Sequence, residues 1–135
     1  MMKGSIMISI AACCLAASCN PTRRIDMHNL SAVEAEITFT IKEDSILVSP
    51  FYLSNAEKMT VRLGTRPPYN LAKLSFGIGP WQRPYLEDIT DDLEKIEIKD
   101  GKGEKKLTSQ EEMIAYLSER ISGVTRRKIK ITIEQ

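Results

Sequence analysis

The stretch EAEITFTIK, residues 34–42, decides the fold class of this chain. Apolar and polar residues alternate along it without a break, and its apolar positions are Ala35, Ile37, Phe39 and Ile41. Successive side chains of a β-strand point to opposite faces of a sheet, so this alternation predicts a strand with one buried and one solvated face. We therefore expect a domain built on a β-sheet.

The sequence that follows supplies further strands. The turn-forming residues 43–45 (EDS) lead into residues 46–48, which are expected to return as the second strand of a hairpin that ends at Pro50. The turn-rich DGKG at residues 100–103 lacks the full spacing of a phosphate loop and is expected to be a hairpin turn. Other strands are predicted over residues 59–63, 74–78, 93–99 and 128–134.

One helix is predicted near the C-terminus. Ser109 and Glu112 have the spacing of a capping box, in which each side chain bonds the backbone amide of the other residue. The helix is expected to end at Gly123, and its apolar stripe would be Met113, Ile114, Leu117 and Ile121. The predicted class is α+β: a mostly antiparallel sheet of about six strands packed against this C-terminal helix, in one domain over residues 32–135. The last strand is expected in the sheet that the helix covers, and a small sandwich with an appended helix would give a similar pattern.

The N-terminal segment has the order of a secretory signal peptide. Lys3 stands near the start, the apolar run 6–15 is broken only by Ser9, and the small residues 16–18 follow. A membrane-spanning helix needs about 20 apolar residues, and this run is much shorter. The pattern predicts that residues 1–18 are a signal peptide and are removed.

The residues Leu15-Ala16-Ala17-Ser18-Cys19 resemble the lipobox of bacterial lipoproteins. The resemblance covers the first 19 residues and implies cleavage before Cys19, whose sulfur would carry a diacylglyceryl group as a membrane anchor. Leu15 stands one place further from the cysteine than in the common pattern. Cys13 has a better local match, but it would leave an apolar run of only about five residues. The alternative is a secreted protein in which Cys19 is a free thiol.

The same resemblance implies a location. Asn20 is not the aspartate that retains lipoproteins in the inner membrane, and no acidic run associated with surface export follows it. The expected place is the periplasmic face of the outer membrane, and a short lipoprotein with a small β-rich domain is similar to envelope lipoproteins of Bacteroidota.

Residues 20–31 are polar, and their second residue is a proline. They are expected to form a flexible tether that contains Arg23, Arg24 and His28.

Composition excludes several kinds of chemistry. Removing residues 1–18 takes one of the 19 basic residues, Lys3, which leaves 18 Lys and Arg against 18 Asp and Glu. A net charge of zero argues against a general nucleic-acid binder. Residues 32–135 contain neither cysteine nor histidine, which removes Cys-His and Ser-His-Asp nucleophile systems and the usual zinc sites. Paired carboxylates of the glycosidase type stay open, because the fold and not the sequence sets their separation. No catalytic residue, metal site or cofactor is predicted. The acidic run 87–94 is expected to be a solvated helix start or turn, and the basic residues 126–128 would complement the dipole at the helix end.

An Arg-Pro-aromatic unit occurs twice, at residues 66–69 and 83–85. Prolines stiffen loops, and Arg, Tyr and Trp are enriched where binding energy concentrates. The candidate binding surface is Arg66, Tyr69, Trp81, Arg83 and Tyr85. The competing interpretation is that Trp81 and Tyr85 close the hydrophobic core. The predicted function is a non-enzymatic, lipid-anchored module that binds a protein partner or supports an assembly in the periplasm; the alternative is an immunity or inhibitor lipoprotein that neutralises a secreted toxin or enzyme.

Overall fold

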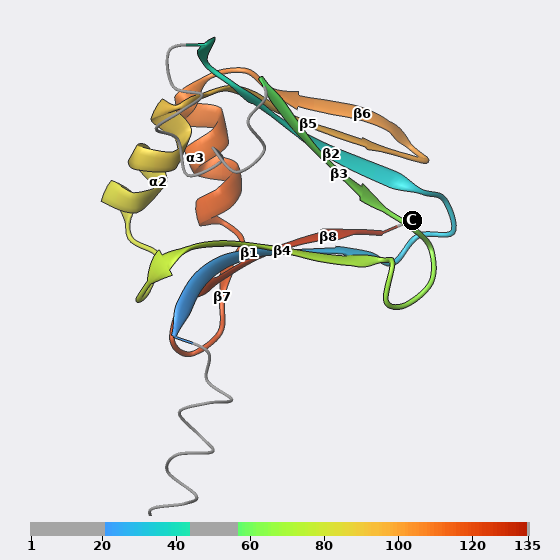
Figure 1. Ribbon diagram of the computed structural model, residues 1–135, viewed down its shortest axis with the longest axis horizontal. Helices are drawn as coiled ribbons and strands as arrows, with labels where there is room; N and C mark the ends of the chain where they lie inside the picture. Colours follow the sequence, from blue (N-terminus) through green and yellow to red (C-terminus); the bar gives the residue numbers. More distant parts are fainter. Residues whose placement is uncertain (1–20, 44–56, 135) are drawn as a thin grey trace, which may run out of the picture.

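A computed structural model describes residues 21–43 and 57–134. Its elements follow in the order β1 Thr22–Asn29, β2 Ala35–Ile41, β3 Lys58–Leu63, β4 Leu71–Ile78, α2 Arg83–Asp91, β5 Leu93–Asp100, β6 Gly103–Leu107, α3 Gln110–Ser118, β7 Ile121–Ser122 and β8 Lys128–Ile133. The eight strands form two sheets of four, with strand orders β4-β1-β8-β7 and β3-β2-β5-β6. In Figure 1 the two sheets converge at the right and diverge at the left, where α2 and α3 fill the space between them.

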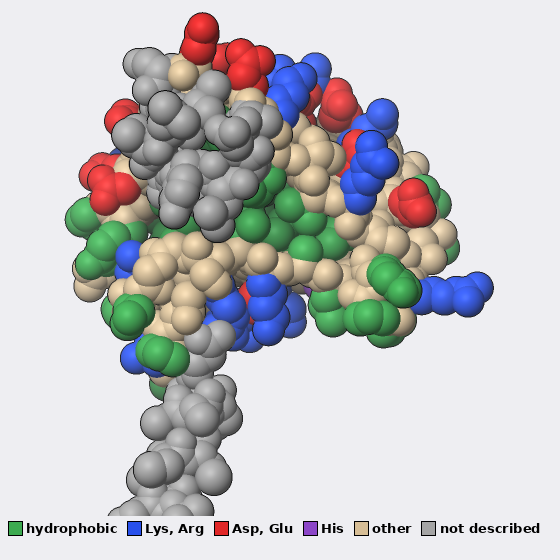
Figure 2. Space-filling model, in the orientation of Figure 1, with side chains coloured by type: hydrophobic (Ala, Val, Ile, Leu, Met, Phe, Trp, Pro, Cys, Tyr) green, Lys and Arg blue, Asp and Glu red, His purple; other side chains and the backbone are tan. Residues whose placement is uncertain are grey.

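The inner faces of the two sheets enclose one hydrophobic core. Ile25, Met27 and Ile131 of the first sheet are fully buried, and so are Ile37 and Ile96 of the second sheet. Figure 2 shows part of this apolar layer in green between the sheets. β2 and β8 contribute every second residue, because alternate side chains of a strand point to the same face. The core is therefore assembled mainly from β-strand alternation, with the helices closing the open end.

The predicted class is confirmed in its coarse form. The chain is α+β and predominantly β, and all pairings are antiparallel except β1 with β8. The strands expected at 59–63, 74–78, 93–99 and 128–134 correspond to β3, β4, β5 and β8, and residues 100–103 form the β5–β6 turn. The expectation of about six strands in one sheet with one helix is wrong, because the described residues hold eight strands in two sheets and two helices. The strand expected at 46–48 lies outside the described residues.

The expected flexible tether is the largest correction. Residues 22–29 form β1, an internal strand that pairs with β4 on one side and with β8 on the other. Ile25 and Met27 point into the core, but the inward positions before and after them are the polar residues Arg23 and Asn29. These polar positions hide the alternation in the sequence. Among the described residues the folded domain thus begins at Thr22 and not at residue 32.

The second helix, α2, was not expected. Its sequence, RPYLEDITD, has few apolar residues, and only Leu86, Ile89 and Thr90 are buried. Pro84 lies in the first turn, where a proline is tolerated because the first amides of a helix have no partner within it. The acidic run predicted as a helix start or turn instead spans the second half of α2 and the first residues of β5. A short helix with so little apolar surface depends on its packing for stability.

The C-terminal helix, α3, confirms the predicted N-terminus and corrects the predicted end. Ser109 and Glu112 form the capping box, and Met113, Ile114 and Leu117 are buried. The helix ends at Ser118, ahead of Gly123, because Ile121 pairs with Ile129 and so belongs to β7. The helix packs on β5 and β6, whereas β8 lies in the other sheet, so the expectation that the last strand shares the covered sheet is wrong.

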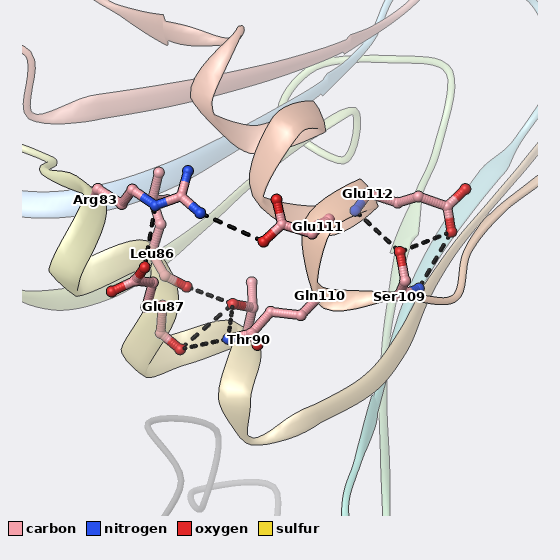
Figure 3. A network of polar contacts seen from close by, with 8 residues as sticks. All are labelled: Arg83, Leu86, Glu87, Thr90, Ser109, Gln110, Glu111 and Glu112. Atoms are coloured by element: carbon pink, nitrogen blue, oxygen red, sulfur yellow. Dashed lines mark hydrogen bonds and ion pairs between the residues drawn. The ribbon is translucent and has the colours of Figure 1, made fainter.

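A polar network joins the two helices at their exposed side (Figure 3). The Arg83 guanidinium contacts the Glu87 carboxylate at 3.0 Å within α2 and the Glu111 carboxylate of α3 at 3.4 Å. The Gln110 amide donates a hydrogen bond to the buried Thr90 hydroxyl at 3.2 Å. Exposed ion pairs contribute little to stability. The network mainly fixes how α2 lies against the start of α3.

Replacing Ser109 with alanine is expected to destabilise the protein by about 1 kcal/mol at pH 7, because the Glu112 amide loses its acceptor. Hydrogen bonds from the Thr108 amide and the Ser109 side chain lower the pKa of Glu112. A carboxyl with a lowered folded-state pKa stabilises the fold above its unfolded pKa, and this contribution is lost as the pH falls through the folded-state pKa. NMR titration should show a low Glu112 pKa that rises in Ser109→Ala, and an unchanged pKa would contradict the capping geometry.

Candidate functional site

The β1–β2 loop and the β3–β4 loop meet at the C-terminal end of β1, where Asn29 forms hydrogen bonds to both of them. Its amide nitrogen donates to the carbonyl oxygens of Val33 at 2.8 Å and Gly64 at 3.0 Å, with a longer contact to that of Leu63 at 3.4 Å. Its amide oxygen accepts hydrogen bonds from the backbone and hydroxyl of Ser31, at 3.0 and 2.7 Å. A buried carbonyl left without a donor is costly. An asparagine at the end of a core strand therefore supplies hydrogen-bond donors and an acceptor that an apolar residue could not.

The β3–β4 loop is also held by its own backbone. The Gly64 amide donates to the Tyr69 carbonyl at 2.8 Å, and the Asn70 amide donates to the Arg66 carbonyl at 3.1 Å. The backbone amide of Asn29 also donates a hydrogen bond to the backbone carbonyl of Asn70 at 2.9 Å. A side chain at Gly64 would meet Tyr69 Cβ at 3.2 Å, so the glycine lets the two ends of the loop approach closely. Several independent contacts thus fix the conformation of the β3–β4 loop.

Apolar side chains are exposed on these two loops. Tyr69 is 75% exposed and Leu71 is 52% exposed, and Leu30 and Val33 are also largely accessible to solvent. We call the set that they form with the exposed Arg66 the apical surface: Leu30, Val33, Arg66, Tyr69 and Leu71. Figure 2 shows apolar side chains gathered at the lower right, next to a protruding basic side chain. Clustered exposed apolar residues on a fixed scaffold are typical of an interaction site.

The five residues predicted as one binding surface lie in two places. Arg66 and Tyr69 belong to the apical surface, before β4, whereas Trp81, Arg83 and Tyr85 follow β4 at its other end. Trp81 is 1% exposed, and its indole nitrogen donates to the Arg24 carbonyl at 3.0 Å. The competing interpretation, in which this tryptophan closes the core, is confirmed. Arg83 takes part in the ion pairs between the helices.

Arg23 lies against the two aromatic residues of this second group, of which Trp81 is buried and Tyr85 is 37% exposed. Its guanidinium carbon lies 3.6 Å from the centre of the Tyr85 ring and 5.5 Å from that of Trp81, and its Nη1 donates to the Ile78 carbonyl at 2.9 Å. A cation over aromatic faces is attracted by their quadrupoles, more strongly when it is shielded from water. A side chain at Gly77 would come within 3.1 Å of the guanidinium. Arg23 is thus an internal residue. It stands two positions before Ile25, so the alternation of a strand places the two side chains on the same inward face.

A metal site is also considered within the described residues. In residues 21–43 and 57–134 no group of three or more His, Cys, Asp or Glu side chains is placed to hold a metal ion. None of the helices in that part of the chain has the length and apolar character to cross a membrane. His28 lies in β1 and is partly exposed on the outer face of the sheet.

Comparison with protein-family models, with curated proteins and with solved structures finds no match for this chain. The candidate site therefore rests on the geometry of the apical surface alone.

Proposed function

We propose that the protein is a lipoprotein of the bacterial envelope, anchored through Cys19 at the periplasmic face of the outer membrane. The lipobox-like residues 15–19 support the anchor. A single acyl chain gives only marginal membrane binding, so the two chains of a diacylglyceryl group would make the attachment stable. Intact-mass measurement of the purified protein tests it: the expected mass is that of residues 19–135 with the lipid, and Cys19→Ser should remove the lipid.

The anchored domain acts as a non-enzymatic module that binds a partner protein through the apical surface. The observation that carries this proposal is the exposure of Tyr69 and Leu71 on loops fixed by Asn29. Fixed loops lose little conformational entropy on binding, and exposed aromatic and apolar residues provide the area that a partner would bury. The apical surface lies beyond Asn29, at the opposite end of the eight-residue β1 from Thr22. At about 3.3 Å per residue, Asn29 stands about 23 Å from Thr22, the residue of β1 nearest the anchor.

Photo-crosslinking in intact cells tests the binding role. A benzoylphenylalanine in place of Tyr69 should form a discrete adduct, and adding Arg66→Ala should reduce its yield roughly 30-fold, the effect of losing a hot-spot residue of about 2 kcal/mol. Arg62→Ala is the matched control, because Arg62 is an exposed arginine on the outer face of β3. An identical adduct pattern from the same probe at Thr60 would contradict the proposal. A secreted toxin in the adduct would favour the immunity function.

A further inference from the structure

Strand β1 begins only three residues after Cys19, so the domain lies close to its proposed anchor. Pro21 is two residues beyond Cys19, and its carbonyl accepts a hydrogen bond from the Gly79 amide at 3.0 Å. Two extended residues span at most about 7 Å. If Cys19 carries the lipid, as the proposed function states, the domain surface around Thr22 must lie at the membrane. The inference below rests on that anchor.

Two apolar side chains are exposed around this end of β1. Ile78 pairs with Thr22 and is 75% exposed, and Val124 in the β7–β8 loop is fully exposed. The loop that carries Val124 is fixed to the domain, because the Arg126 carbonyl accepts from the Trp81 amide at 2.7 Å and the Arg127 carbonyl accepts from the Arg24 amide at 2.9 Å. Neither apolar side chain is covered by the described residues. Both stand where the chain leaves towards Cys19.

Positive charge collects on the adjoining outer face of the first sheet. Lys128 lies opposite Arg24, and the next row places Lys130 and Lys73 on either side of Asp26. Asp26 is the one carboxylate that the described strands of this sheet place among these cations, and the Arg24 guanidinium contacts it at 3.1 Å. The following row, around His28, has no acidic or basic partner: its neighbours are a leucine and a threonine. Lys128 therefore lies near the Thr22 end of the sheet, and Lys73 and Lys130 lie near its middle.

We call these residues of the Thr22 end and of the adjoining outer face the basal surface: Lys73, Ile78, Val124, Arg126, Lys128 and Lys130. Figure 2 shows basic side chains along the lower side of the molecule, with apolar side chains at the lower left. The acidic side chains gather on the helices and the upper side in the same view. Basic side chains stand among the acidic ones on the upper side, whereas the basic side chains of the lower side have few acidic neighbours in this view.

We propose that the basal surface docks on anionic phospholipid head groups, with Ile78 and Val124 inserted at the membrane interface. Anionic surfaces attract each nearby cation enough to favour the docked state about fivefold. The apolar side chains add interfacial burial. The anchor alone would leave the domain free to rotate about its short connection. Docking on this surface would hold the domain in one orientation on the bilayer.

The test uses the lipid-modified full chain purified from bacterial membranes and reconstituted in vesicles. All three native cysteines lie within residues 1–19, so Val124→Cys adds the single thiol available for a fluorescent label after processing and acylation. We expect quenching of this label by spin-labelled lipids in vesicles containing phosphatidylglycerol, and little quenching in pure phosphatidylcholine. A label at Ala115→Cys, on an exposed position of α3, should remain in water in both cases.

Neutralising the basal lysines supplies the decisive comparison. The triple variant Lys73→Gln, Lys128→Gln and Lys130→Gln should shift the docking equilibrium on the order of 100-fold towards the undocked state. The matched control neutralises Lys58, Lys99 and Lys106 on the outer face of the other sheet and should leave quenching unchanged. A lipid-modified protein whose Val124 label stays in water, or equal effects of the two triple variants, would overturn the docking surface. An unmodified Cys19 in the intact mass would overturn the anchor instead.

Discussion

Replacing Met27 with alanine is expected to lower the free energy of unfolding by about 3 kcal/mol. Met27 has no exposed surface and lies in a strand that is paired on both sides. Removing its side chain takes apolar area out of the core and leaves a cavity between the two sheets, which the close-packed surroundings fill only in part. Equilibrium denaturation by urea, followed by circular dichroism, measures the change.

His28→Ala is the matched control for this variant, because His28 is the next residue of β1 and points to the outer face of the sheet. Its effect should stay within about 0.5 kcal/mol. Residues 22–29 acting as a flexible tether would make both substitutions equally harmless. A Met27→Ala protein as stable as the parent would therefore contradict the internal position of β1.

Asn29→Ala is expected to cost a similar amount, roughly 3 kcal/mol. The substitution leaves the Gly64 carbonyl without its donor at 3.0 Å and the Ser31 backbone amide without its acceptor at 3.0 Å. The Val33 carbonyl loses the Asn29 donor at 2.8 Å but keeps the hydrogen bond from the Ser31 hydroxyl. Each buried polar group without a partner costs about 1–3 kcal/mol, and relaxation of the loops recovers part of the total. The thermal midpoint, measured by scanning calorimetry, should fall by about 10 °C.

Asn70→Ala provides a graded comparison at the same end of the domain. The Asn70 amide donates to the Asn29 carbonyl at the longer distance of 3.3 Å, and its side-chain oxygen is buried without a hydrogen-bond partner. We expect a loss of about 1 kcal/mol. Photo-crosslinking from residue 69 should also weaken in Asn29→Ala, because the apical loops lose their shared support. Equal stability losses in the two asparagine variants would contradict the special role of Asn29.

The parts of the fold that could be predicted from the sequence are those with a strict local pattern. Alternation marked β2 and β8, whose inward residues are all apolar, and the spacing of Ser109 and Glu112 marked the start of α3. β1 was missed because its inward positions at Arg23 and Asn29 are polar, and their partners lie far away in the sequence. Alternation reports that one face of a strand is buried but not which surface covers it, so it could not separate one sheet from two.

The candidate site shows the same division. The exposure of Arg66 and Tyr69 fits the proline-rich loop predicted from residues 66–69. Trp81 and Tyr85 have the same local sequence character but lie against Arg23, a contact that only the fold creates. Leu30 and Val33 join the apical surface because Asn29 brings the β1–β2 loop to the β3–β4 loop. Such long-range contacts leave no regular spacing that a single sequence can reveal.

Both the anchor-proximal basal surface and the opposed apical surface depend on β1 as an internal strand that begins at Thr22. Hydrogen–deuterium exchange of the backbone amides of residues 24–28, followed by NMR, measures this most directly. We expect these amides, bonded to β4 and β8, to exchange at least about 1,000-fold more slowly than in an unfolded peptide, as core strands of a stable domain do. Exchange at the rate of an unfolded peptide in a protein whose β2 and β5 amides are protected would contradict it.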